Sequence, residues 1–160
     1  MCEFGWEWSG RFVPDVPGDM TVMLRHVHLE AKYLLQIRIT LEDASYVIRF
    51  RREPPAFAPY RIENRTMGNV WFVQAGLREG GSPSERAAEV LLPYHACAYS
   101  WDEPLLQRKV ELELQAGEGV LRREALGAFS FNPDLPTRRP SKGVLVVVET
   151  RGPIRVMVIT

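Results

Sequence analysis

The chain has 160 residues, of which 46% are hydrophobic and 25% charged, a composition typical of one folded domain and unlike that of a disordered segment. Twenty Lys and Arg residues balance twenty Asp and Glu residues, so net charge gives no general attraction to nucleic acid or to an anionic bilayer. Two cysteines, Cys2 and Cys97, are too few for a disulfide framework and favour a reduced, cytoplasmic setting.

The first half of the chain alternates between apolar and polar residues. Residues 1–18 are rich in aromatic and turn-forming residues and are interpreted as a lead-in segment. Three period-two stretches follow at about ten-residue spacing, the pattern of an antiparallel sandwich or barrel. The expected strands are residues 20–29, 33–41 and 46–50, with a turn at Asp43-Ala44.

The most informative stretch is residues 59–66. Tyr60, Ile62 and Asn64 share one parity and are expected to face inward, while Arg61 and its alternating neighbours face outward. A turn at residues 67–68 is expected to form a hairpin with residues 69–74. An amide on an inward face requires partners, so we expect Asn64 to be hydrogen-bonded to a nearby loop or to strand backbone.

The remaining sequence continues the pattern, with interruptions. Glycine, serine and proline predict a loop at residues 78–85, and residues 85–92 favour a helical turn that ends at Pro93. Residues 132–142 contain three prolines and are expected to form a loop. Further strands are expected at residues 110–115, 143–149 and 154–159. The fold class is therefore all-β, a single antiparallel β-sandwich-like module over residues 1–160, with its core in residues 19–160.

Chemistry-bearing motifs give little support for an enzyme. His26 and His28 share a strand face and His95 is a possible third ligand, but no carboxylate or cysteine is spaced to complete a metal site. Asp102 and Glu103 are adjacent, so an extended backbone directs them apart and they cannot flank one bond. No nucleophile or phosphate-loop motif is present. We expect no catalysis, no cofactor and no metal.

The order of several segments gives a more specific signal. Residues 59–66, a strand that ends at Gln74, Leu92-Pro93 and then residues 99–104 (Tyr-Ser-Trp-Asp-Glu-Pro) occur in this order. This arrangement resembles the adaptor-binding domain of the vacuolar protein sorting 13 family, also known as the SHORT-ROOT-binding type. Residues 8–18 and 152–156 fit the edges of the same unit, so the resemblance covers most of the chain.

The resemblance implies one repeat unit of a tandem of all-β modules, each with an asparagine at the place of Asn64. It implies attachment to a lipid-transfer protein at membrane contact sites, with recruitment through proline-x-proline peptides of organelle adaptors. The implied partners are such peptides and adjacent β modules, with membrane contact only indirect. Candidate structural or peptide-site residues are Asn64, Tyr60, Arg61, Tyr99, Trp101, Asp102 and Pro104.

Residue chemistry leaves alternatives to peptide binding. Trp101 is expected to anchor its segment in the core, Pro104 to end strand pairing, and Asp102 and Glu103 to cap a turn or to pair with Arg61 or Arg65. The module is then a structural spacer that binds nothing itself. A third hypothesis is glycan or lipid binding through exposed Trp6, Trp8 or Trp71, which requires at least one solvent-facing ring.

Overall fold

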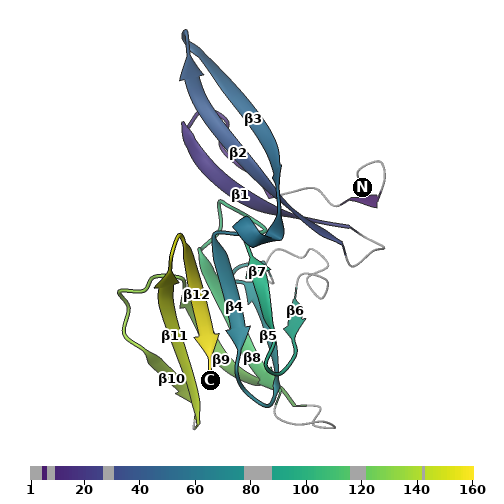
Figure 1. Ribbon diagram of the computed structural model, residues 1–160, viewed down its shortest axis with the longest axis vertical. Coiled ribbons are helices and arrows are strands. Elements are labelled where there is room, and N and C mark those ends of the chain that lie inside the picture. The colour runs from purple at the N-terminus through teal and green to yellow at the C-terminus, as the bar shows by residue number, and fades with distance from the viewer. Residues whose placement is uncertain (1–4, 7–9, 27–30, 78–87, 116–121, 142) are drawn as a thin grey trace. The chain divides into compact units, whose positions relative to one another are not determined.

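The computed structural model describes residues 5–6, 10–26, 31–77, 88–115, 122–141 and 143–160 (Figure 1). The described chain is all-β, as predicted, with twelve strands and one short 3-10 helix, η2 (Pro55–Phe57). None of its described helices has the length and apolarity to cross a membrane. By its contacts the chain divides into two compact units, Met1–Ala58 with Ser100–Leu106, and Pro59–Tyr99 with Gln107–Thr160. The assignment of residues 1–160 to one functional module stays a prediction.

The first unit is built on a three-stranded antiparallel sheet in the order β1-β2-β3. Its strands are β1 (Gly18–Arg25), β2 (Lys32–Glu42) and β3 (Ser45–Glu53). They confirm the three strands predicted from alternation, although residues 27–29 of the first lie outside the described residues. Asp43 and Ala44 form the two-residue turn with φ of 45° and 64°, a left-handed conformation that suits the twist of a tight hairpin.

The apolar side chains on one face of this sheet form a small core. Val22, Ile37 and Ile39 are at most 2% exposed, and Phe12 packs against them from the segment that precedes β1. Towards the β2–β3 turn the same face of the sheet is exposed to solvent, as Leu41 is 57% exposed. The opposite face carries ion pairs, of which Arg38 with Asp19 and Arg49 with Glu42 are examples.

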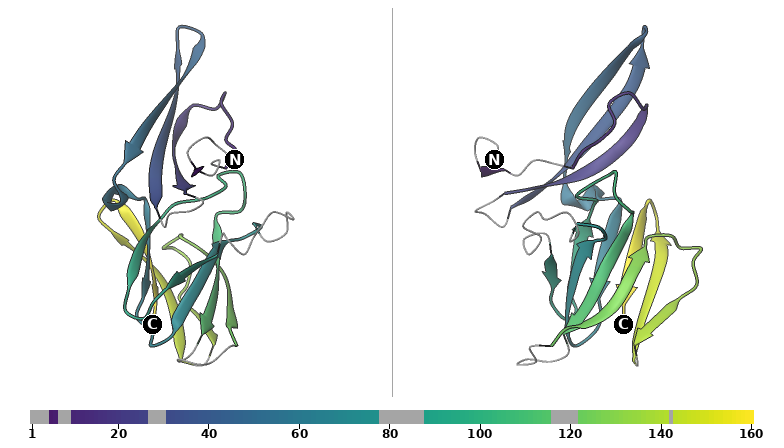
Figure 2. Two further views of the ribbon diagram at one scale, coloured as in Figure 1. Left: turned by 90° about the vertical axis from the view of Figure 1, so that its right-hand side faces the viewer. Right: turned by 180° about the vertical axis from the view of Figure 1, so that it is seen from behind.

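The second unit contains two sheets that form the two layers of a sandwich (Figures 1 and 2). A five-stranded sheet has the order β10-β11-β12-β4-β7, and a four-stranded sheet has the order β6-β5-β8-β9. The strands are β4 (Tyr60–Asn64), β5 (Asn69–Gln74), β6 (Glu89–Leu91), β7 (Ala96–Tyr99), β8 (Lys109–Gln115), β9 (Glu124–Ser130), β10 (Arg138–Ser141), β11 (Val144–Arg151) and β12 (Ile154–Ile159).

The predicted hairpin of β4 and β5 is wrong. The turn at residues 65–68 carries the chain from one sheet to the other, so β4 pairs with β7 and β12 while β5 pairs with β6 and β8. Both strands carry apolar residues on an inward face, and alternation alone does not distinguish two paired strands from two stacked strands. The predicted parity of β4 is confirmed, with Ile62 and Asn64 buried and Arg61 exposed.

One strand pair of the sandwich joins residues that are far apart in sequence. The pairing of β12 with β4 is parallel, whereas the other strand pairs of this unit are antiparallel. Its register places Met157 beside Ile62, both with 0% exposure. In Figure 1 the yellow β12 lies next to the blue-green β4.

Two further sequence predictions require correction. Residues 138–141, assigned to a loop, form the edge strand β10, where Pro140 is tolerated because an edge strand leaves one side of its backbone unpaired. Residues 89–91, assigned to a helical turn, form the short strand β6 because they pair with β5. The rest of that predicted turn, up to residue 87, lies outside the described residues.

Candidate functional site

Asn64 ends β4 and is 1% exposed. Its Nδ2 donates to three backbone oxygens, those of Gly68 at 2.8 Å and of Leu91 and Leu92 at 3.0 Å each. Its Oδ1 accepts hydrogen bonds from the backbone N–H of Thr66 at 2.9 Å and from the Thr66 hydroxyl at 2.7 Å. The expectation that this amide is satisfied by loop and strand backbone is therefore confirmed.

These bonds join the two layers of the sandwich. Asn64 belongs to the five-stranded sheet, whereas Leu91 lies in β6 of the four-stranded sheet and Gly68 directly precedes β5. Gly68 is needed at this corner, since a Cβ there would lie 2.5 Å from the carbonyl oxygen of Gln115. We call Asn64, Thr66, Gly68 and the Leu91–Leu92 carbonyls the Asn64 clamp. Its two N–H hydrogens and two acceptor lone pairs are all used within the chain.

Tyr60 and Tyr99 serve the core of the same unit. They are register partners in β4 and β7, and Tyr99 is 1% exposed. The ring of Phe131 lies 4.6 Å from that of Tyr60 and 5.5 Å from that of Tyr99, and Phe72 of the other sheet meets Tyr99 edge-on at 6.0 Å. Aromatic rings at these separations attract one another beyond their buried area. Both tyrosines therefore lie in an aromatic cluster of the core.

Arg61 lies on the outer face of the five-stranded sheet. Its Nε is 3.1 Å from Glu63, which also accepts hydrogen bonds from Arg65 and Arg151. Partial burial raises the pKa of Glu63, but the hydrogen bonds from Arg151 and Arg65 outweigh this effect and hold the pKa below its ordinary value. Arg61 is thus one of three cations around a single carboxylate.

Trp101, Asp102 and Pro104 belong to the first unit. Trp101 is 5% exposed, which confirms its predicted burial, and it forms a parallel bridge with Val22 of β1. The hydroxyl of Ser100 donates to the carbonyl of Thr21 at 2.6 Å. Ser100 and Trp101 therefore lie along β1, on the side of β1 that faces away from β2.

Asp102 does not pair with Arg61 or Arg65, which was one of the predicted outcomes. Its carboxylate takes two hydrogen bonds from Arg25, at 2.9 Å from Nε and 3.2 Å from Nη2, and both side chains are about 15% exposed. Neither spacing nor alternation could identify Arg25, which lies 77 residues away along the chain. The carboxylate of Glu103 accepts the backbone N–H of Arg11 at 3.0 Å.

Glycine at position 10 allows this segment to approach closely. The backbone N–H of Gly10 donates to the carbonyl of Asp102 at 3.0 Å. A Cβ on Gly10 would overlap that oxygen and would lie 2.7 Å from the Cδ of Pro104. Trp101, Asp102 and Pro104 are therefore fixed between β1 and residues 10–11, and their part in any binding event stays a prediction.

The other sequence hypotheses have less support. The ring of Trp6 is partly buried and stacks on Tyr33 at 4.5 Å, and Trp71 is partly buried beneath Arg123 at 3.6 Å; Trp8 lies outside the described residues. Among the described residues no three potential metal ligands gather, and His28 is outside them.

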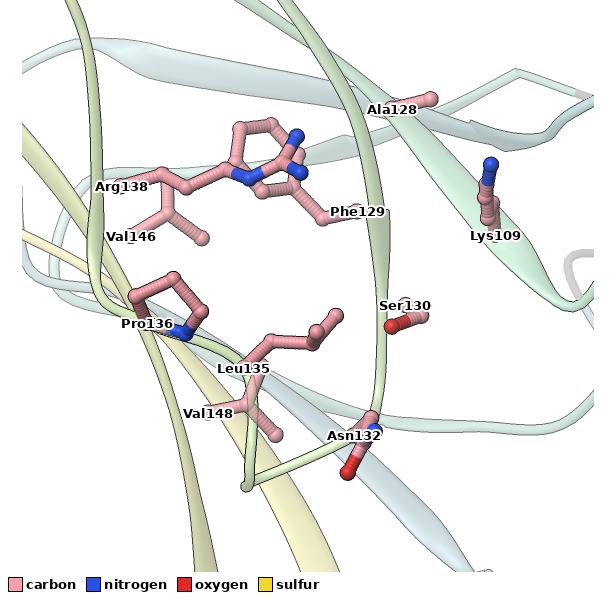
Figure 3. Close-up of a pocket in the computed structure, with 10 residues that line it drawn as sticks. All are labelled: Lys109, Ala128, Phe129, Ser130, Asn132, Leu135, Pro136, Arg138, Val146 and Val148. Atoms are coloured by element: carbon pink, nitrogen blue, oxygen red, sulfur yellow. The ribbon is translucent and has the colours of Figure 1, made fainter.

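The structure also contains a slot that the sequence did not indicate. It lies in the second unit between β9 and β10, the last strands of their two sheets, beside the connection through residues 131–137 (Figure 3). Its cavity volume is about 70 Å³. We call it the β9–β10 slot. The prolines near residue 136 predicted only a loop, so no local signal marked a binding surface there.

Comparison with known proteins places this geometry in a family. The family model described as Vacuolar-sorting associated protein 13, adaptor binding domain, matches residues 1–108. The intermembrane lipid transfer protein vps13D of Dictyostelium discoideum is 29% identical over 114 residues, which cover 69% of this chain. The human intermembrane lipid transfer protein VPS13D is 30% identical over 108 residues, or 68% of this chain. The matched residues are 2% of the length of each of these curated relatives.

Proposed function

The chain belongs to the vacuolar protein sorting 13 adaptor-binding domain family, and from this we propose that it is a non-catalytic interaction module that holds proline-x-proline adaptor peptides. Through such adaptors it attaches a lipid-transfer protein to organelle membranes and contact sites from the cytoplasm. The observation that carries the proposal is the family match, which spans the Asn64 clamp and the Trp101 segment.

The sheets offer edges of the kind that such a peptide requires. Both β3, with nine residues, and β9, with seven, are terminal strands of their sheets. A terminal strand leaves one row of backbone N–H and C=O groups without a sheet partner, and an extended peptide can add to that row. The other terminal strands of the second unit are shorter, at three or four residues each.

The proline-x-proline spacing suits strand addition for a physical reason. In an extended chain, alternate residues direct their backbone groups to the same edge and their side chains to the same face. Two prolines separated by one residue therefore place both missing N–H groups on the edge that faces away from the protein. The middle residue can make the ladder hydrogen bonds, while both rings present apolar surface on one face.

Amide chemical shifts of the labelled chain test this proposal. A short peptide with one proline-x-proline unit is titrated to about 1 mM, a concentration that detects weak specific binding, and compared with the same peptide carrying alanine at both prolines. The expected result is a set of shifts along one edge strand that the alanine peptide does not produce. An unchanged spectrum with the proline peptide would contradict peptide binding.

A second candidate, a structural spacer within a longer β tandem, is favoured by one observation. Every hydrogen-bonding group of the Asn64 side chain is engaged within the chain, so this residue serves the fold whether or not a ligand binds elsewhere. The spacer function predicts that no adaptor peptide raises the melting temperature, since only a ligand of the native state stabilises it. A peptide-dependent rise in melting temperature would contradict it.

A further inference from the structure

We propose that the β9–β10 slot is the seat of the adaptor peptide, and that it selects a peptide with a carboxylate two positions from one of its prolines. This inference rests on the proposed function and adds to it the edge strand, the pocket and the charge of the ligand. The slot residues, 109–148, lie beyond the family match over residues 1–108. The family comparison therefore does not itself assign this site.

The floor of the slot is apolar. Phe129 and Val146 are 7% and 3% exposed and belong to opposite sheets, and Val148 lies on the same parity of β11 as Val146. Leu135, which is 48% exposed, enters the space between the two strands from the connecting segment (Figure 3). A proline ring matches such a floor, because the side-chain part of the ring is entirely hydrocarbon.

The rim of the slot is positively charged. Arg138 extends from β10 towards β9 (Figure 3), and Lys109 lies opposite Ser130 in the register of β8 and β9. The residues that line the slot include no carboxylate, and within the described chain neither Arg138 nor Lys109 has an ion-pair partner. Arg38, Arg49 and Arg61, three other exposed arginines, each contact a carboxylate.

A buried polar atom also lies at the slot. The hydroxyl oxygen of Ser130 is buried and has no hydrogen-bond partner among the described residues. A buried hydroxyl without a partner is uncommon because its desolvation is then uncompensated.

The shape of β9 favours ligand addition at its C-terminal half. Its pairing with β8 shifts register between Leu112 and Glu113, which leaves Leu126 as an extra residue, and Gly127 has a φ of 104°. Such bulges bend an edge strand and redirect the residues beyond them. Beyond the bulge, Ala128, Phe129 and Ser130 line the slot.

Charge on the ligand follows from this arrangement. In an extended peptide, a residue two positions from a proline presents its side chain on the same face as the proline ring. With the ring on the apolar floor, a carboxylate at that position faces the same side as Arg138, which is the register partner of the floor residue Val146. Opposite charges at a rim mainly raise the association rate and reject ligands of the wrong sign.

Fluorescence anisotropy with the full 160-residue chain tests the inference. Three short fluorescein-labelled peptides are compared: a proline-x-proline peptide with aspartate two positions after the second proline, the same peptide with lysine there, and the aspartate peptide with both prolines changed to alanine. The tested variant is Arg138→Glu. Arg139→Glu is its matched control, because Arg139 is an adjacent exposed arginine that does not line the slot.

The wild type is expected to bind the aspartate peptide best. Arg138→Glu is expected to weaken that binding about tenfold through like-charge repulsion and to reverse the preference in favour of the lysine peptide. Arg139→Glu should keep the wild-type preference. Circular dichroism of both variants confirms folding, and the lysine peptide provides a gain of binding that an unfolded variant cannot produce.

The two proposals fail in different ways. Equal binding of the aspartate and lysine proline peptides, or equal effects of Arg138→Glu and Arg139→Glu, would overturn the slot and leave peptide binding intact. Amide shifts along β3 rather than β9 would do the same. If the wild type binds neither proline peptide better than the alanine peptide, both proposals are wrong.

Discussion

The Asn64 clamp gives the sharpest prediction for the stability of the second unit. Asn64→Ala removes all five hydrogen bonds of the side chain. Two of the carbonyls keep another donor, because Thr66 also contacts Gly68 at 3.2 Å and the His95 N–H contacts Leu92 at 3.2 Å. The clamp bond to the Thr66 N–H has no such replacement in the clamp, whereas Leu91 also pairs with Val70 in the ladder of β6 and β5.

The magnitude follows from the backbone groups that lose Asn64 as a partner. A buried polar group that loses its partner costs about 1–3 kcal/mol. The Thr66 N–H is only partly buried, so we expect the free energy of unfolding to fall by about 1–3 kcal/mol.

Asn64→Asp is the informative variant to compare with Asn64→Ala, because it keeps the size and the acceptor oxygen of the side chain. It places a carboxylate oxygen where Nδ2 now lies about 3 Å from three carbonyl oxygens. We expect it to destabilise more than alanine at pH 7, since an unpaired charge would be buried among acceptors. Protonation restores one donor, so the deficit of the aspartate variant should shrink as the pH falls.

Urea unfolding measures these effects, with hydrogen exchange of β4 and β5 amides to assign the loss to the second unit. Thr66→Val is a milder control that removes only the hydroxyl. The reasoning is refuted if Asn64→Ala changes stability by less than about 0.5 kcal/mol, the range of ordinary surface substitutions. It is refuted equally if Asn64→Asp is as stable as the wild type at neutral pH.

Three further perturbations test other parts of the structure. Gly10→Ala should destabilise the first unit by more than about 1 kcal/mol, because its Cβ overlaps the backbone of Asp102, and thermal unfolding that matches the wild type would contradict this. Hydrogen bonds from Arg49 and Thr40 lower the pKa of Glu42 from 4.5 to about 2. Stability from that carboxylate is therefore present above pH 4.5 and lost as the pH falls towards 2, so Glu42→Gln should flatten acid unfolding of the first unit, and an unchanged pH profile would count against it. The last prediction concerns a chain that stops at residue 108, where the family match ends. It should keep dispersed amide signals in the first unit and lose them in residues 59–99, because the strands that pair with β4 and β5 include β12 and β8. Native signals in residues 59–99 would refute the sheet pairing.

Local pattern was sufficient to predict individual strands. The parity of β4 correctly indicated that Asn64 faces inward, because a period of two is a property of the backbone that neighbouring residues already determine. The same holds for the β2–β3 hairpin, whose two-residue turn fixes the pairing. These predictions depend on residues close together in sequence.

Pairing between strands that are distant in sequence could not be predicted in the same way. One of the two partners of β4 is β12, almost one hundred residues later. A strand with one apolar face buries that face equally well in either layer of the sandwich. For this reason β5 was assigned to a hairpin with β4. Edge position explains the second error, because the prolines around β10 exclude only a central strand and permit one at the margin of a sheet.

The candidate site shows the same division between local and distant information. Asn64 was predictable because one polar residue interrupts an apolar parity, and its energetic consequence follows from burial alone. The β9–β10 slot was not predictable, because its floor and rim come from β8, β9, β10 and β11, and none of its residues is unusual among its neighbours in sequence. A residue that holds the layers together leaves a signal in its own strand. A surface that binds a ligand where two sheets end becomes visible only when both sheets are assembled, so the two kinds of site require different evidence.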